Sequence, residues 1–239
     1  FLHGVDAPMY YVALMTFILI FSSVTMVLAV DAGHHMNKSK VTFYMLLTII
    51  GGAVFVGSQA WEWKNFIKGE YGALETKGGQ ILQFVNSDTG KRVAIADFAV
   101  SIPTERSTHK LSNGIWYENE GSLPTYSLVE VLEGFESNNN LVIRTEKLDE
   151  NGHKIVLTRD DSLDKIYNAI GVVEGANLVH NEYGNRLFAD FFFFITGFHG
   201  FHVFSGVIIN LIIFFNVIVG TYEKRGHYEM VEKVGLYWH

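Results

Sequence analysis

The sequence contains no cysteine among its 239 residues. This absence excludes disulfide bonds, iron–sulfur clusters, and any copper or zinc site that requires thiolate ligands. It does not fix the compartment, because an extracytoplasmic domain can fold without disulfides. Charged residues are also nearly absent from three stretches, at about 9–32, 41–61 and 188–219. Most of the charge lies between the last two, from about 64 to 186.

The three uncharged stretches are each long enough to cross a membrane, since about 20 apolar residues span a hydrocarbon core about 30 Å thick. Core helices of a large soluble domain are the alternative. They seldom run this long without charge, and the run Phe191–Ile195 offers no polar face. We therefore expect an α-helical polytopic membrane protein with three complete transmembrane helices. A β-rich extramembrane insertion domain is expected between the second helix and the third.

Within the insertion, short apolar runs separated by turn residues predict strands. Residues 80–85 form one candidate, followed by turn residues at 86–90 and a further candidate at 92–102. Residues 141–145 and 154–158 flank a glycine-containing turn at 149–152, which is typical of a β-hairpin. Residues 163–170 are predicted to form a short helix.

Lysine and arginine in the short connections predict the orientation. Lys38 and Lys40 follow the first span, and Lys224, Arg225 and Lys233 follow the third. Basic short loops are normally cytoplasmic, and an even number of crossings puts these two segments on the same side. The insertion is then expected on the outer face.

Polar and small residues gather on one face of each span. On the third span this face holds Thr196, His199, His202, Gly206 and Asn210. On the second it holds Gly51, Phe55, Ser58 and Glu62, with Gln59 at its margin. These two faces are expected to pack together, because polar groups that face lipid go unsatisfied. On the first span, Ser22, Met26, Ala29 and Gly33 form a face that allows close approach of another helix.

An ionisable side chain inside a span is costly and usually has a role there. Three roles are open for His199 and His202: haem or metal ligation, proton relay, and packing or lipid contact. Two histidines at i and i+3 make a poor axial pair, because axial ligands lie on opposite faces of a haem. A metal site would need further histidines or carboxylates, and the spans offer few. Packing or lipid contact is therefore favoured, with no catalytic, cofactor or metal site predicted in this chain.

Two other ionisable positions remain open. Glu62 stands between Trp61 and Trp63, and tryptophans suit the membrane interface, so it is either an interfacial carboxylate or a buried functional one. His34 and His35 lie in the short basic connection after the first span. A solvated turn is the favoured interpretation there. The alternative is a proton-collecting surface, because histidine titrates near neutral pH.

Four motifs, in the same order, resemble subunit III of the haem–copper cytochrome c oxidases. The family signature T-G-F-H-G-x-H-V is similar to residues 196–203, and its Q-A-x-E-aromatic motif is similar to residues 59–63. Its S-S-x-T helix with a following H-H turn resembles residues 22–35. The start of its Y-W-H-F-V-D helix resembles residues 237–239.

The resemblance implies a domain organisation. Residues 9–68 match the family's fourth and fifth transmembrane helices, and residues 183–239 match the sixth and the start of the seventh. Residues 69–182 are the β-rich outer-face insertion, where the family usually has a short connection. Because the chain begins with Phe1 and ends inside a motif, we expect a fragment cut at both ends, lacking the family's first three helices.

The resemblance also implies a function. Subunit III is a non-catalytic accessory subunit of a proton-pumping oxidoreductase complex in aerobic respiratory electron transport. It packs on subunit I, binds phospholipid, and supports proton uptake and sustained turnover. It carries no cofactor, and haem and copper belong to the partner subunits I and II. The motif positions carried over, as structural or lipid contacts only, are His199, His202, Gly200, Gln59, Glu62 and Trp63.

The resemblance also implies a location and a partner, and alternative functions stay open beside it. The implied location is a bacterial plasma membrane, with the insertion on the periplasmic side. There the acidic excess of the insertion fits steering of a basic cytochrome c, although a solvated surface packed on neighbouring subunits is the simpler expectation. A quinol oxidase subunit III is one alternative function, and a stand-alone membrane sensor or binding protein is another. Nucleic acid is not an expected partner.

Overall fold

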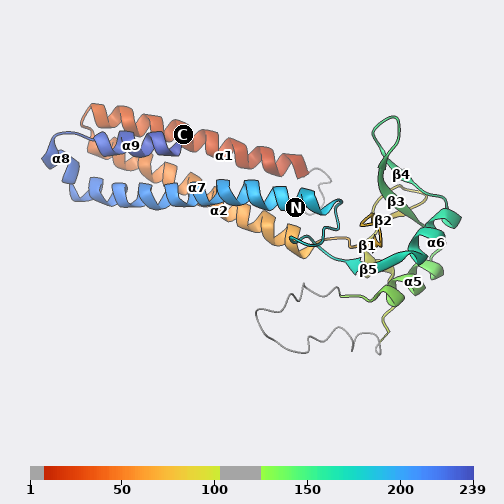
Figure 1. The fold of residues 1–239 in the computed structure, drawn as a ribbon. Coiled ribbons are helices and arrows are strands. Elements are labelled where there is room, and N and C mark those ends of the chain that lie inside the picture. The colour runs from red at the N-terminus through yellow and green to blue at the C-terminus, as the bar shows by residue number, and fades with distance from the viewer. Residues whose placement is uncertain (1–7, 103–124) are drawn as a thin grey trace. The chain divides into compact units, whose positions relative to one another are not determined.

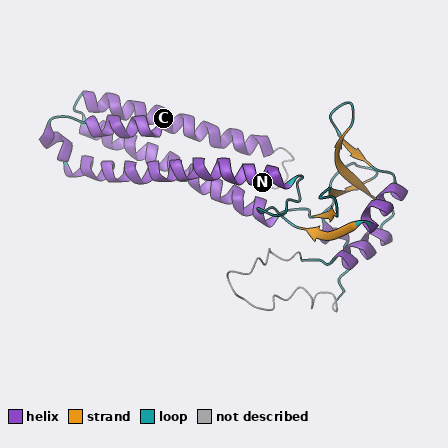
Figure 2. Cartoon of the chain, in the orientation of Figure 1, coloured by secondary structure: helices purple, strands orange, loops and turns teal. Residues whose placement is uncertain are grey.

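The computed structural model of this chain describes residues 8–102 and 125–239 (Figure 1). Two compact units are present. One combines the chain up to Trp63 with residues 194–239, and the other contains residues 64–193. Figure 2 shows that the first is helical and that the second holds all the described strands.

Three helices are long and apolar enough to cross a membrane, which confirms the three predicted apolar spans by length and composition. They are α1 (Pro8–His34), α2 (Lys38–Lys68) and α7 (Arg186–Val219). The 34 residues of α7 extend about 50 Å, which exceeds the thickness of a bilayer core. Asn37 begins α2 by accepting the backbone N–H of Lys40, and Asn185 begins α7 by accepting that of Leu187.

Two further helices return along the bundle. They are α8 (Thr221–Arg225) and α9 (Glu229–Trp238). The close-approach face predicted on the first span is confirmed, because α9 packs against it. A Cβ at Gly235 would lie 3.2 Å from Val30 and 3.4 Å from Met26, and one at Gly33 would lie 3.0 Å from Tyr228. The small residues therefore set how closely α1 and α9 approach.

The insertion contains one five-stranded antiparallel sheet in the order β4-β3-β2-β1-β5. Its strands are β1 (Ala73–Thr76), β2 (Ile81–Asn86), β3 (Leu141–Leu148), β4 (Lys154–Val156) and β5 (Ala169–Val173). The predicted hairpin is confirmed as β3 and β4, and the strand predicted at 80–85 is confirmed as β2.

Short helices share the core of this sheet. They are α3 (Ile95–Phe98), α5 (Leu128–Ser137) and α6 (Arg159–Tyr167). Alternate β2 residues, Leu82 and Phe84, are buried against Phe135 of α5 and Ile166 of α6. The described part of the insertion is thus an α+β arrangement, which corrects the expectation of a simply β-rich domain.

One local prediction was wrong, and the bounds of another were displaced. The candidate strand at 92–102 contains only an isolated bridge at Arg92 and then the turn of helix α3, which buries Ile95 and Phe98. The helix predicted at 163–170 begins earlier and ends earlier. Thr158 caps its start by accepting the Asp161 N–H, and it ends at Tyr167 so that the next residues can pair with β1 as strand β5.

One buried carboxylate joins the two connections of the insertion. Glu182 is fully buried, and its side chain accepts four backbone N–H groups. Oε1 accepts from Glu70 at 3.1 Å and Tyr71 at 3.2 Å, while Oε2 accepts from Gly72 at 3.1 Å and Gly175 at 2.6 Å. Residues 70–72 and residue 175 are thereby held to one anion.

Candidate functional site

The predicted polar faces of α2 and α7 meet in part, because Phe55 and Gln59 lie against α7 while Gly51 lies against Ser22 of α1 and Gly206 against Trp238 of α9. The Trp63 indole N–H donates to Thr196 Oγ1 at 2.9 Å. The His199 ring meets Phe55 edge-on, with 5.3 Å between ring centroids. A Cβ at Gly197 would lie 3.4 Å from Trp63, so the glycine sits directly under the indole. Residues of two separate motifs therefore form one helix–helix seam.

Glu62 and Gln59 are paired within α2. Gln59 Nε2 donates to Glu62 Oε2 at 2.8 Å, and both side chains are buried. Gly200 of α7 faces Gln59, because a Cβ there would lie 3.9 Å from the Gln59 Cγ. Of the two interpretations of Glu62, this geometry favours a buried carboxylate satisfied by its own helix.

Trp238 of α9 lies where α9 meets the three long helices α1, α2 and α7. Its indole N–H donates to Ser22 Oγ of α1 at 3.1 Å. A Cβ added to Gly52 of α2 would overlap the six-membered ring, and one added to Gly206 of α7 would lie 2.9 Å from it. Two glycines therefore make the space that the indole fills, and a serine satisfies its only donor.

Polar residues around Trp238 satisfy one another. Tyr237 Oη and Ser205 Oγ are 2.7 Å apart, and the Tyr237 ring lies 4.7 Å from that of His202. His239 Nδ1 is 2.5 Å from Ser23 Oγ. A hydrogen bond in an apolar surrounding avoids the cost of an unsatisfied polar group. These contacts thus hold α1, α7 and α9 together.

A second polar seam joins α1 to α2. Thr25 and Thr48 are buried, with their hydroxyl oxygens 2.8 Å apart. The Thr48 hydroxyl also lies 3.4 Å from the carbonyl oxygen of Ser22. Ser22 thereby belongs to both contacts. We call the residues of these contacts the motif cluster: Ser22, Ser23, Thr25, Thr48, Gly52, His202, Ser205, Gly206, Tyr237, Trp238 and His239.

A groove of about 480 Å³ borders the motif cluster. Its lining combines Leu19, Ile20, Ser23, Val24, His199, His202, Val203, Trp238 and His239. Three imidazoles thus line one largely apolar groove. Within residues 8–102 and 125–239, however, no three histidine or carboxylate side chains are grouped so that they could hold a metal ion. The groove can accept an apolar chain with a polar end.

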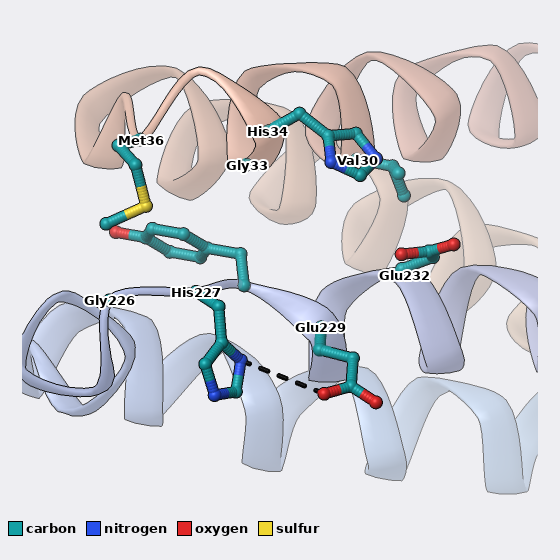
Figure 3. A pocket seen from close by; sticks show the side chains of 9 residues that line it. Val30, Gly33, His34, Met36, Gly226, His227, Glu229 and Glu232 are labelled. Carbon is teal, nitrogen blue, oxygen red and sulfur yellow. Dashed lines mark ion pairs between the residues drawn. The ribbon is translucent and has the colours of Figure 1, made fainter.

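The connection between α1 and α2 carries the predicted proton-collecting pair, and its two histidines are separated. His34 lines a cleft of about 360 Å³ together with His227, Glu229 and Glu232, as Figure 3 shows. His35 instead lies 2.9 Å from the carbonyl oxygen of Asp31.

Two segments supply the ionisable groups of this cleft, one at the end of α1 and one at the start of α9 (Figure 3). His227 Nδ1 is 3.9 Å from Glu229 Oε2. A hydrogen bond from Lys233, with its charge, lowers the pKa of Glu229, so this carboxylate is ionised near neutral pH. Of the predicted pair, His34 lines this cleft, whereas His35 lies 3.7 Å from the carboxylate of Asp31.

A cationic cluster in the insertion has no counterpart in the predictions. Arg144 Nη2 donates to Gln83 Oε1 at 2.8 Å, and Lys154 Nζ donates to the same oxygen at 3.3 Å. Burial, with Arg144 and Arg92 nearby, lowers the pKa of Lys154. The Arg92 guanidinium lies over the Tyr71 ring, 4.4 Å from its centroid. The contacts to Gln83 thus join the side chains of β2, β3 and β4.

The sequence predictions did not include the central role of Trp238. The sequence did contain a signal, namely the aromatic pair at 237–238 and the glycines at 52 and 206 in two apolar spans.

Comparison of this chain with protein-family models, with curated proteins and with solved structures finds no match. The case for a function therefore rests on the residues and their geometry.

Proposed function

We propose that this chain is the accessory subunit III of a proton-pumping haem–copper terminal oxidase. In this proposal it packs on the catalytic subunit, binds phospholipid, and supports proton uptake and sustained turnover. It carries no redox centre of its own, and haem and copper belong to subunits I and II. The membrane is a bacterial plasma membrane, with the insertion on its periplasmic side.

The observation that carries the proposal is the convergence of the motifs. Residues 22–25, 196–206 and 237–239 are far apart in the sequence, yet they meet around one indole. If the motifs matched the family by chance, there would be no reason for their residues to bond to one another. Their polar groups are used in joining helices, which is the work of a packing subunit.

The groove beside the cluster supports the lipid part of the proposal. It pairs apolar side chains with the imidazoles of His199 and His202. A phospholipid has the same division into an apolar chain and a polar head. We therefore assign these histidines to lipid contact and packing rather than to ligation or proton relay.

The cleft between the end of α1 and the start of α9 supports a role in proton uptake. His34 and His227 stand in it beside two carboxylates, Glu229 and Glu232. Histidine is the residue type generally used to take up and release protons near neutral pH. The proposal keeps proton collection for His34 and leaves His35 as a solvated residue.

Purification of the full-length protein from its native membrane, through an affinity tag, tests the proposal. We expect haem absorbance and the partner subunits I and II to copurify in mild detergent. Oxidation of cytochrome c by that complex supports the cytochrome c oxidase assignment. Oxidation of quinol alone supports the quinol oxidase alternative. A protein that runs alone, without haem absorbance, would refute both and favour a stand-alone sensor or binding protein.

A matched pair of variants tests the accessory role. His202→Ala removes the ring that lies against Tyr237. It should leave the haem spectrum intact, weaken retention of this subunit during purification, and shorten the active lifetime under turnover. His35→Ala, in the exposed turn, is the control and should change neither. Loss of a haem band in His202→Ala would contradict the accessory role.

A further inference from the structure

A tight hairpin in the insertion exposes two large apolar residues at its tip. Residues 175–182 fold back on themselves, with Glu182 N–H donating to Gly175 at 2.9 Å and Asn177 N–H donating to His180 at 2.8 Å. The Asn177 side chain accepts the N–H groups of Val179 and His180, each at 2.7 Å. The turn is thus built by an asparagine and presents the residues between, Leu178 and Val179.

The residues at this tip are unusual for a solvated turn. Turns between paired strands favour asparagine, aspartate and glycine, which are polar or conformationally free. Here the side chains of Leu178 and Val179 are 68% and 54% exposed. Adjacent exposed apolar side chains on a rigid turn indicate a contact with an apolar partner.

The base of this hairpin is fixed to the ends of two apolar helices. The Ala176 N–H donates to the carbonyl oxygen of Phe66, in the last turn of α2, at 3.0 Å. Tyr183 stacks on Phe66 with ring centroids 5.0 Å apart and planes within 9°. Three residues after Tyr183, α7 begins. The tip therefore lies near the point where both helices leave the insertion.

The first turns of α7 carry large apolar side chains that are exposed. Leu187, Phe188 and Phe191 are each more than half exposed. Large apolar side chains at the start of a membrane helix need lipid or partner atoms around them. We therefore place the bilayer interface beside Leu187, Phe188 and Phe191. The hairpin tip then has the same surroundings, because its base is hydrogen-bonded to Phe66 of the neighbouring helix end.

A polar pocket lies beside the tip. It has a volume of about 380 Å³, and Val179 and His180 form part of its lining. Arg186 and Lys77 also line it, together with the glycines of the turn between β1 and β2. Its carboxylate, Glu75, is 3.0 Å from His180. Even with Glu75 counted as one negative charge, Arg186 and Lys77 give the pocket a positive balance.

We propose that Leu178 and Val179 enter the bilayer interface and that the pocket beside them holds the phosphate of a phospholipid from the same leaflet. An apolar tip next to a cationic pocket matches the two parts of such a molecule. Arg186 is well placed, because it stands at the first turn of a membrane helix, where headgroups lie. The inference requires that the apolar helices span a membrane and is independent of the oxidase assignment.

Site-directed spin labelling tests the insertion of the tip, and the natural absence of cysteine makes single-cysteine variants direct. Leu178→Cys and Val179→Cys carry the label, and Asn151→Cys in the turn between β3 and β4 is the water-exposed reference. The full chain is reconstituted in vesicles of phosphatidylcholine and phosphatidylglycerol. Collision with oxygen should dominate at 178 and 179, and collision with a water-soluble nickel chelate should dominate at 151. Nickel-dominated collision at both tip positions would overturn the proposal.

A second measurement tests the headgroup pocket. Spin-labelled phosphatidylglycerol should show an immobilised fraction whose affinity falls about fivefold for each charge removed by Arg186→Gln or Lys77→Gln. Lys91→Gln, an exposed lysine of the same unit that does not line the pocket, is the matched control and should change nothing. Equal affinity in all three variants would overturn the pocket assignment. Displacement of the lipid by inorganic phosphate alone would show a free-anion site and would also overturn it.

Discussion

Replacement of the buried carboxylate of Glu182 by an amide gives the sharpest test of the insertion's architecture. The carboxylate accepts four backbone N–H groups, two on each oxygen. In Glu182→Gln one oxygen becomes an NH2 group, which donates and cannot accept. Two of the four N–H groups then lose their acceptor and face another donor.

The magnitude follows from the number of bonds. A hydrogen bond to a charged group contributes about 1.5–3 kcal/mol, so two lost bonds cost about 3–6 kcal/mol. A whole domain is typically stable by only about 5–15 kcal/mol. We therefore expect Glu182→Gln to loosen the two connections and to leave the insertion marginally stable.

Amide hydrogen exchange of the full chain measures this effect directly. The backbone amides of one pair, either Glu70 and Tyr71 or Gly72 and Gly175, should exchange about 100-fold faster or more in Glu182→Gln, because the amide oxygen can face only one pair and about 3 kcal/mol corresponds to that factor. Glu174→Gln is the matched control, since it removes the same charge from an exposed carboxylate that accepts one N–H group. If the amides of Glu70, Tyr71, Gly72 and Gly175 all exchange at wild-type rates in Glu182→Gln, the carboxylate does not hold these connections.

Three further predictions concern the bundle, the sheet and the insertion as a whole. Gly52→Ala should destabilise the helical unit by about 1–3 kcal/mol in detergent unfolding, because its Cβ overlaps the Trp238 ring. Thermal stability of the insertion should rise with pH as the ordinary titration range of lysine, about 10, is approached from below. Burial lowers the pKa of Lys154, so the unfolded chain keeps a proton that the folded chain has lost, and Lys154→Met should flatten the rise. If the chain is the proposed oxidase subunit and its insertion only packs on neighbouring subunits, deletion of residues 72–180 should leave the salt dependence of cytochrome c oxidation unchanged, whereas a weaker dependence would indicate steering.

Each of the first two has an internal control. Gly57→Ala, on the same helix, meets no atom within 4 Å and should be neutral or slightly stabilising. Equal effects at Gly52 and Gly57 would contradict the packing argument for Trp238. Above pH 10 the slope should reverse, because burial raises the pKa of Tyr183 and the unfolded chain then loses its tyrosine proton first. A Lys154→Met variant with an unchanged slope below pH 10 would refute the assignment.

The sequence was sufficient to predict the three apolar helices, because composition over twenty or more residues needs no tertiary information. The close-approach face on α1 was also predictable, since small residues at helical spacing identify it. Helix α9, which fills that face, was not identified. It is short and carries charged residues, and its key contact joins Ser22 to Trp238 across 216 positions.

The insertion was harder for the same physical reason. Strand β1 has four residues and β5 has five, and each is defined by pairing with the other rather than by its own pattern. Glu182 was not singled out, because a single glutamate in a polar segment carries no periodic signal. Three of the four N–H groups that it accepts belong to residues 70–72, more than 100 positions away, and only the folded chain brings them together.

The junction at Glu182 bears on how the insertion can be exchanged by engineering and gained or lost in evolution. The chain leaves α2 at Lys68 and returns beside it, where the Ala176 N–H meets the Phe66 carbonyl. A segment whose two ends are adjacent can be added to a helical hairpin, or removed from it, with little displacement of the helices. Exchange of residues between these two ends for another compact domain is therefore a practical route to chimeric membrane proteins, with the Glu182 contact retained as the splice point.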